Sequence, residues 1–173
     1  MALAITGTGN GSLNNLALSA NTATIVDTGR AGGIIQVVTA TTSTSVTVSS
    51  TTFTDTTLTA SITPTSSSNK VMVMVCQHAN AYGGSAAKGG IQIVRGSTTI
   101  YESLMNTSSE PYQFSSQSNG IVGFITINFL DSPSTTSSTT YKTQGAAGAH
   151  NMLFQGNDQT NAVSTITLME IVA

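Results

Sequence analysis

The feature that most constrains the fold is a succession of short β-type segments separated by turn residues, with no convincing helix. Residues 45–49 alternate between polar and apolar side chains, and Ile91–Arg95 and Thr98–Leu104 flank a Gly96-Ser97 turn. About eight to ten such segments follow one another, with turn signals at intervals of roughly 8–12 residues. We therefore expect an all-β chain in which two antiparallel sheets pack face to face, as a β-sandwich or jelly-roll-like domain.

The segment Lys70–His78 is apolar on both of the faces that a strand presents. One face would carry Val71, Val73 and Val75, and the other would carry Met72, Met74 and Cys76. A strand of this kind is covered twice, once by its own core and once by another layer. We therefore expect Met72, Met74 and Cys76 to lie on a strand at an oligomer interface. Cys76, the single cysteine, is interpreted as a small buried hydrophobe rather than a reactive thiol.

The composition indicates how such a domain would stay in solution and what would protect its edges. Ser and Thr make up about 30% of the chain and charged residues only 7%, whereas about 25% is usual for charged residues. Threonine suits a pleated strand through its branched Cβ and keeps the outer face wet through its hydroxyl. The Lys, Glu and Pro residues that usually protect strand edges are scarce. We therefore expect a closed homo-oligomer, with a homotrimer as the first hypothesis.

The first 30 residues differ from the remainder. Gly and Asn oppose a helix there, and the apolar residues are too sparse for an independent core. We expect residues 1–30 to be an extended N-terminal arm that anchors the protein on a neighbouring subunit, and residues 31–173 to be the β-sandwich domain. The alternative is a leader that folds back onto its own domain. The apolar residues of this assembly arm are Leu13, Leu16, Leu18, Ile25 and Val26.

The same sequence argues against several other classes of protein. Its five basic residues are scattered and its net charge is −2, so a nucleic-acid partner is not expected. No apolar run approaches the roughly 20 residues of a membrane helix. The N-terminus lacks the basic and apolar regions of a signal peptide. We expect a soluble protein that contains no membrane-spanning helix and no secretion signal, and that has no membrane partner.

The sequence predicts no enzyme. His78 and His150 stand alone, and no paired Cys or His spacing suits a metal. No G-x-S-x-G elbow is present for a nucleophilic serine. The carboxylates are spread singly, without the D-x-D cluster of a calcium site or the paired acids of a glycosidase. We therefore expect no catalytic residue, no cofactor and no metal.

Two segments are predicted to be long loops, and both carry aromatic residues. Residues 79–90 contain four glycines and Tyr82, and residues 106–118 contain Tyr112 and Phe114. Aromatic side chains on loops can stack against sugar rings, which makes Tyr82, Tyr112 and Phe114 a candidate receptor-facing group. With aromatic residues at 5% of the chain and no Trp, packing within a loop or an interface is the alternative interpretation.

Several segments from residue 31 onward resemble a recurring module of tailed bacteriophages that infect marine and freshwater bacteria, including cyanophages. These segments are residues 33–38, 53–64, 67–71, 129–133, 140–144 and 164–171, which match in the same order. Such modules occur in virion surface proteins, described as tail-fibre pieces or as structural proteins without an assigned role. The resemblance implies a virion protein that is assembled in the host cytoplasm. Many relatives carry a longer N-terminal portion, so the resemblance does not extend to a long fibre shaft.

Two roles on the virion follow from this resemblance. In the first, homotrimers decorate or cement the outside of the capsid, and their N-terminal arms reach other virion proteins such as the major capsid protein. In the second, the domain is the tip of a tail fibre or head fibre and binds a receptor on the host surface, such as a glycan. The short arm favours the first role, whereas the hydroxyl-rich surface and the aromatic loops favour the second.

Overall fold

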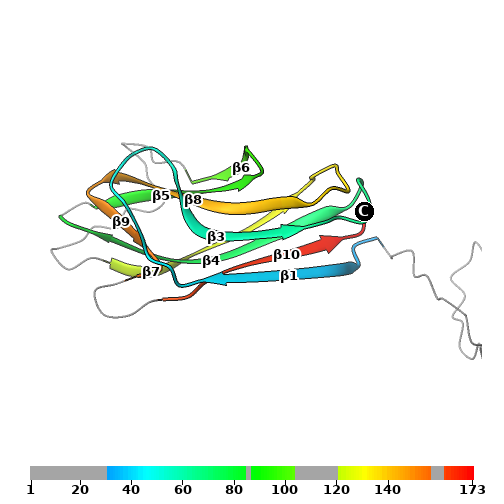
Figure 1. Ribbon diagram of the computed structural model, residues 1–173, viewed down its shortest axis with the longest axis horizontal. Helices are drawn as coiled ribbons and strands as arrows, with labels where there is room; N and C mark the ends of the chain where they lie inside the picture. Colours follow the sequence, from blue (N-terminus) through cyan, green and yellow to red (C-terminus); the bar gives the residue numbers. More distant parts are fainter. Residues whose placement is uncertain (1–30, 85–86, 104–120, 157–161) are drawn as a thin grey trace, which may run out of the picture.

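The computed structural model describes residues 31–84, 87–103, 121–156 and 162–173. Within these ranges the chain is all-β and contains no helix, as the sequence predicts. Figure 1 shows the strands running along the long axis of the molecule. They are β1 (Ile34–Thr42), β2 (Val46–Val48), β3 (Thr54–Ile62), β4 (Lys70–Tyr82), β5 (Lys88–Arg95), β6 (Thr98–Glu102), β7 (Ile121–Asp131), β8 (Thr139–Ala149), β9 (Asn151–Phe154) and β10 (Ser164–Ile171).

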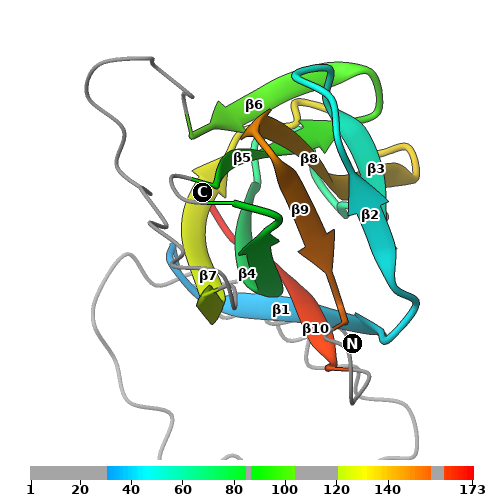
Figure 2. The ribbon, with the colours of Figure 1, turned by 90° about the vertical axis from the view of Figure 1, so that its left-hand side faces the viewer.

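The strands form two antiparallel sheets that pack against each other as a β-sandwich, seen end-on in Figure 2. The smaller sheet has the order β3-β8-β5-β6. In the six-stranded sheet, β4 pairs with β7 along one side. Along its other side, β4 pairs with β10 as far as Cys76, and beyond that residue it pairs with β9. Strand β1 continues the sheet beyond β10, and β2 continues it beyond β9. The chain crosses between the two sheets several times, so both sheets contain strands from distant parts of the sequence.

The core lies between the sheets and follows the period-two pattern of the strands. In β3 and β10 every second residue is buried, while the threonines between them point outward. Most of the largest side chains that are fully enclosed are aromatic or aliphatic and come from both sheets, and Gln77, Gln155 and Glu170 are enclosed with them. The aromatic and aliphatic ones include Leu58, Ile62, Ile91, Ile93, Tyr141, Met152, Phe154, Ile166 and Leu168.

Three strands extend beyond the bounds that the sequence predicts for them, which are residues 70–78, 91–95 and 139–144. The predicted loop at 79–90 is wrong in extent, because β4 continues to Tyr82 and β5 begins at Lys88. Strand β8 also continues through small residues to Ala149. The physical reason is β9, which pairs with the end of β4 in the larger sheet and packs against β5 and β8 of the smaller sheet. A Cβ atom at Gly145 would collide with the Phe154 ring, and one at Gly89 would collide with the Met152 side chain.

A charged cluster joins the two sheets along one side of the core. Arg95 of β5 donates hydrogen bonds to both carboxylate oxygens of Asp131 of β7, each at 2.8 Å. The buried Tyr141 hydroxyl of β8 donates to the same carboxylate at 2.7 Å. Burial, together with the adjacent Asp131 carboxylate, raises the pKa of Tyr141 far above its ordinary value. The cluster satisfies a carboxylate that would otherwise be costly to bury.

A second buried carboxylate organises the turn before β4. Oε1 of Glu170 accepts hydrogen bonds from the backbone N–H of Thr65, the Thr65 hydroxyl and the Asn69 amide, at 2.7–2.8 Å. Burial alone would raise the pKa of Glu170, but these hydrogen bonds outweigh it and hold the pKa below its ordinary value. The side chain therefore fixes the residue 63–69 turn, which the sequence predicts from its Pro and Ser content.

The described chain enters and leaves the domain at the same end of the sandwich (Figure 1). The backbone N–H of Gly32 donates to the carbonyl of Val172 at 2.7 Å, and the N–H of Val172 donates to that of Gly33 at 2.9 Å. The predicted arm, residues 1–30 with Leu13, Leu16, Leu18, Ile25 and Val26, lies outside the described residues. A segment that precedes Ala31 would connect to the domain at this end.

Candidate interaction surfaces

The outer face of the larger sheet carries an apolar row that crosses four strands. In the antiparallel register, Met169 of β10 lies opposite both Val37 of β1 and Met72 of β4. Met72 in turn lies opposite Leu130 of β7. Directly opposed residues share a face of the sheet, so these four side chains form one continuous row. Met74 and Cys76 follow Met72 on the same face of β4.

Much of this face is open in a single chain. The exposed fraction is 57% for Val37, 49% for Leu130, 39% for Met74 and 61% for Phe124. Contiguous exposed apolar surface is uncommon on a monomeric protein and usually marks an interaction site. The predicted interface residues Met72, Met74 and Cys76 therefore do share one outward face. Whether another molecule covers that face stays a prediction.

The interpretation of Cys76 as a buried side chain is wrong for the single chain, because its thiol is exposed on this face. Sequence reasoning also missed Phe124 and Leu130. The signal was present, since these residues alternate with the inward Ile125, Ile127 and Phe129 of β7. Because the inward residues of β7 are apolar as well, the two outward apolar side chains did not stand out in the sequence.

The apolar face carries almost no charge. Among the described residues of its six strands, Lys70 is the one Asp, Glu, Lys or Arg that points outward. Its Nζ donates to the Ser132 hydroxyl at 2.7 Å, at one end of the face. Glu170 and Asp131 belong to the same sheet but are buried on the inner side. A face without charge can meet a copy of itself without electrostatic repulsion.

His78 continues this face toward the other end of β4, where its ring is buried. The ring of Phe124 lies edge-on to it, with 5.3 Å between centroids. Burial lowers the pKa of His78, which favours the neutral imidazole. His78 is therefore a buried, uncharged ring that packs against Phe124.

The outer face of the smaller sheet is different, because it is polar and its groups satisfy one another. Nζ of Lys142 donates to Oδ2 of Asp55 at 2.9 Å, and the Gln144 amide donates to Oδ1 of Asp55 at 2.6 Å. These hydrogen bonds, with the charge of Lys142, lower the pKa of Asp55. Gln92 donates to Gln144 at 2.5 Å across the neighbouring pair of strands. This face therefore suits contact with water.

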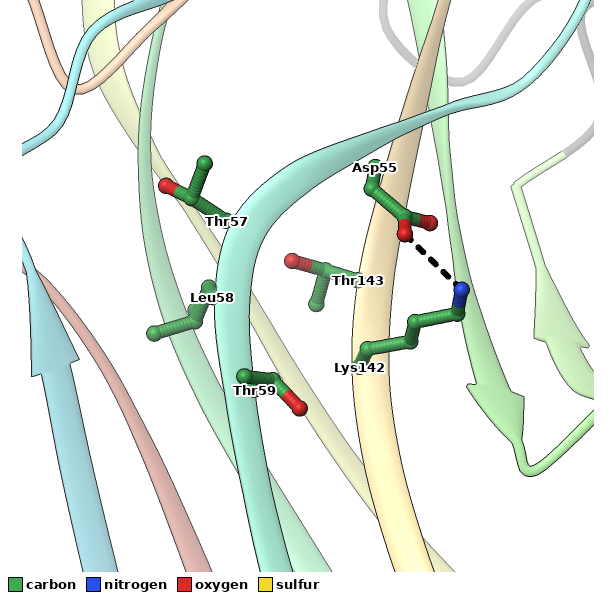
Figure 3. A pocket seen from close by; sticks show the side chains of 6 residues that line it. All are labelled: Asp55, Thr57, Leu58, Thr59, Lys142 and Thr143. Carbon is green, nitrogen blue, oxygen red and sulfur yellow. Dashed lines mark hydrogen bonds and ion pairs between the residues drawn. The ribbon is translucent and has the colours of Figure 1, made fainter.

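A small hollow interrupts the polar face where β3 bows away from β8. Asp55 lies opposite Gln144 and Thr59 lies opposite Lys142, so three residues of β3 face Thr143 alone. The bulge leaves a hollow of about 140 Å³. Figure 3 shows Thr143 between the two strands and the Asp55–Lys142 ion pair at one side. Its lining consists of Asp55, Thr57, Leu58, Thr59, Lys142 and Thr143.

The predicted receptor-facing residues are only partly placed. Tyr82 is not in a loop: it is the last residue of β4, opposite Asn151 of β9, and it is half-buried. Tyr112 and Phe114 lie outside the described residues. The structure therefore does not bring the three aromatic residues together as one described site.

Within the described part of the chain, no three His, Cys, Asp or Glu side chains gather as metal ligands. The same residues contain no helix that is long and apolar enough to cross a membrane. Comparison with protein-family models finds no match, and comparison with curated proteins finds none either. The surfaces described above are therefore the basis for assigning a function.

Proposed function

We propose that this chain is a structural protein of a bacteriophage virion, a homotrimeric decoration or cement protein on the outside of the capsid. The observation that carries the proposal is the difference between its two outer faces. One face carries exposed apolar side chains among threonines and is nearly free of charge, whereas the other is polar and internally hydrogen-bonded. A domain of this kind is suited to being covered by other protein subunits on one face and exposed to water on the other.

The strand edges support self-association. In the described residues, β1 and β7 each pair with a neighbour along one side only. Strand β1 contains no Lys, Glu or Pro, the residues that usually discourage pairing at an edge. Neighbouring copies would cover both this edge and the apolar face beside it. A closed ring of copies would bury such edges without leading to an open fibre.

Attachment to the particle is assigned to the arm, residues 1–30. Because the described chain begins beside its own C-terminal residues, an arm would leave from one end of the sandwich. Several arms in one oligomer would bind neighbouring capsid subunits together, and multivalency would raise the overall affinity. The partners in this proposal are copies of the chain itself and the major capsid protein, with no catalytic step.

Two measurements test the proposal. Light scattering on the purified chain is expected to give about three times the 17.6 kDa mass of one chain. Deletion of residues 1–30 is expected to leave a folded β-domain that no longer joins particles, as measured by immunogold labelling of virions. A monomer in dilute solution, or full incorporation of the truncated protein, would contradict the proposal.

A second candidate function is a fibre tip that binds a host-surface glycan. The specific observation in its favour is the hollow between β3 and β8, with the Asp55–Lys142 ion pair at one side. Immunogold labelling separates the two candidates, because a decoration protein would be labelled over the head and a fibre tip at the end of an appendage. Under both candidate functions, the chain is a virion structural protein that associates with copies of itself.

A further inference from the structure

The hollow between β3 and β8 has the size and chemistry of a small ligand site. A closed cavity of about 150 Å³ accommodates one six-membered ring, and this hollow measures about 140 Å³. It lies on the polar outer face, away from the apolar row that copies of the chain would cover. The site would therefore stay open in the proposed assembly.

Hydrogen-bonding capacity is available around the hollow. The Thr59 hydroxyl donates its proton to the carbonyl of Tyr141 at 3.1 Å, and its oxygen keeps lone pairs that can accept from a ligand. The Thr57 hydroxyl instead contacts Thr42 and Thr44, on the other side of β3 (Figure 3). Each carboxylate oxygen of Asp55 can also accept further hydrogen bonds, and Lys142 keeps donors beyond the one that Asp55 uses.

The charges in the hollow favour a neutral ligand. The Lys142 ammonium lies 2.9 Å from the Asp55 carboxylate, so each charge is already compensated. An anion would compete with Asp55 for Lys142, and a cation would be repelled by Lys142 while meeting a single carboxylate. A neutral molecule rich in O–H donors meets no such cost. The methyl groups of the threonines can contact its C–H groups.

Backbone geometry gives a second, independent indication. Thr57 has a φ of 68°, a conformation that β-branched residues rarely adopt. Such strained residues concentrate at ligand sites, where the surrounding fold holds them in place. Here the strained residue lines the hollow itself. The bulge that widens the gap between β3 and β8 thus depends on a residue with an unusual conformation.

From these observations we infer that the hollow binds one neutral sugar unit of a glycan. The inference deepens the second candidate function and rests on it for the source of the sugar, the host surface. A ligand of about a dozen non-hydrogen atoms in an open site binds in the millimolar range. An oligomer would present one site per copy, so that avidity strengthens attachment to a glycan-coated surface.

The test uses the full chain labelled with ¹³C at its threonine methyl groups. It is titrated with methyl α-D-glucopyranoside, methyl α-D-galactopyranoside and methyl α-D-mannopyranoside, each to about 50 mM. At least one of them is expected to shift the Thr57 and Thr59 methyl signals in a saturable manner. Asp55→Asn and Thr59→Val should each weaken that binding about fivefold to tenfold, because each removes a hydrogen-bond acceptor. Thr126→Val, on the opposite outer face, is the control and should bind as the wild type does.

Three results would overturn the inference: no saturable shift with any of the three glycosides, unchanged binding by Asp55→Asn, or binding of the anionic N-acetylneuraminic acid alone. The titration is repeated with Met74→Asp, a change on the apolar face that should separate the copies. Binding by this monomeric variant shows the site to be independent of assembly. A trimer that binds no sugar rejects the sugar site alone, and a monomer that binds sugar rejects the trimer alone.

Discussion

Thr57 has a backbone conformation that is unfavourable for a β-branched residue. Its φ of 68° places a branched Cβ in the left-handed region, at a cost of about 1–3 kcal/mol. In return its hydroxyl lies 3.0 Å from that of Thr42, an exposed contact that contributes little. The local conformation is therefore maintained by the surrounding sheets rather than by the residue.

Replacing Thr57 with a residue that tolerates this conformation should stabilise the domain. Asn adopts positive φ more readily than Thr, so Thr57→Asn is expected to raise the free energy of unfolding by about 1 kcal/mol. Thr59→Asn is the matched control, since β3 is paired regularly at that position and Asn is unfavourable in strands. Urea denaturation measures both variants, and a loss of stability in Thr57→Asn equal to that in Thr59→Asn would contradict the prediction.

Glu170 makes the stability of the domain depend on pH. Its pKa is lower in the folded than in the unfolded chain, so the unfolded state binds the proton more readily as the pH falls. Its contribution is therefore complete above the unfolded pKa of about 4.3 and is lost as the pH falls through the folded value.

Glu170→Gln should make the stability of the domain fall less steeply as the pH is lowered. The change should also cost about 1–2 kcal/mol at neutral pH, because hydrogen bonds to a charged acceptor become hydrogen bonds to a neutral one. Thermal unfolding between about pH 3 and 7 measures both effects. Asp55→Asn is the comparison: its carboxylate is exposed, so the profile should change less. An unaltered profile in Glu170→Gln would exclude this carboxylate as the source.

At the scale of the strands, the extension of β8 depends on small residues. Gly145 lies against the Phe154 ring, and the structure leaves no space there for a Cβ atom. A close approach of this kind allows β9 to pack beneath the smaller sheet, which explains why residues 145–149 remain in a strand despite their low β-propensity.

Gly145→Ala should therefore destabilise the domain by about 1–3 kcal/mol through overpacking. Gly123→Ala on β7 is the matched control, because no atom lies within 4 Å of its would-be Cβ. Urea denaturation of both variants gives the comparison. Equal stability of the two variants would show that the Phe154 ring can move aside at little cost.

The sequence predicted the fold class and most strands because period-two patterns and turn residues are local signals. It did not predict that β4 continues to Tyr82, because that extension depends on pairing with β9, far away in the sequence. It did not predict that β8 continues to Ala149, because the small residues at its end have low β-propensity. Met72, Met74 and Cys76 were predicted to share a face, as they do. The hollow could not be predicted, since it arises from a bulge between β3 and β8, and the paired residues on either side of that bulge are more than 80 positions apart.

For the molecule as a whole, the proposed assembly depends on the apolar outer face. A charge placed in the centre of a buried apolar contact is costly, whereas the same charge in water is not. Met74→Asp and Leu130→Asp should each reduce the oligomer to monomers and leave the circular dichroism spectrum unchanged. Ser61→Asp, at an exposed position of β3, should retain the wild-type mass. Light scattering at equal concentration decides between these outcomes, and an intact oligomer in both apolar-face variants would reject this face as the interface.

The position of β10 between β1 and β4 has a consequence during synthesis. A ribosome releases β1 and β4 long before the strand that must lie between them. Until β10 emerges, the larger sheet has a gap between β1 and β4, and the row that crosses four strands does not exist. Such distant pairing makes folding slow, and during that time the facing sides of β1 and β4 are unpaired edges that other nascent chains can contact. The order of the strands thus makes β10 the segment that joins the two parts of the larger sheet and removes these edges.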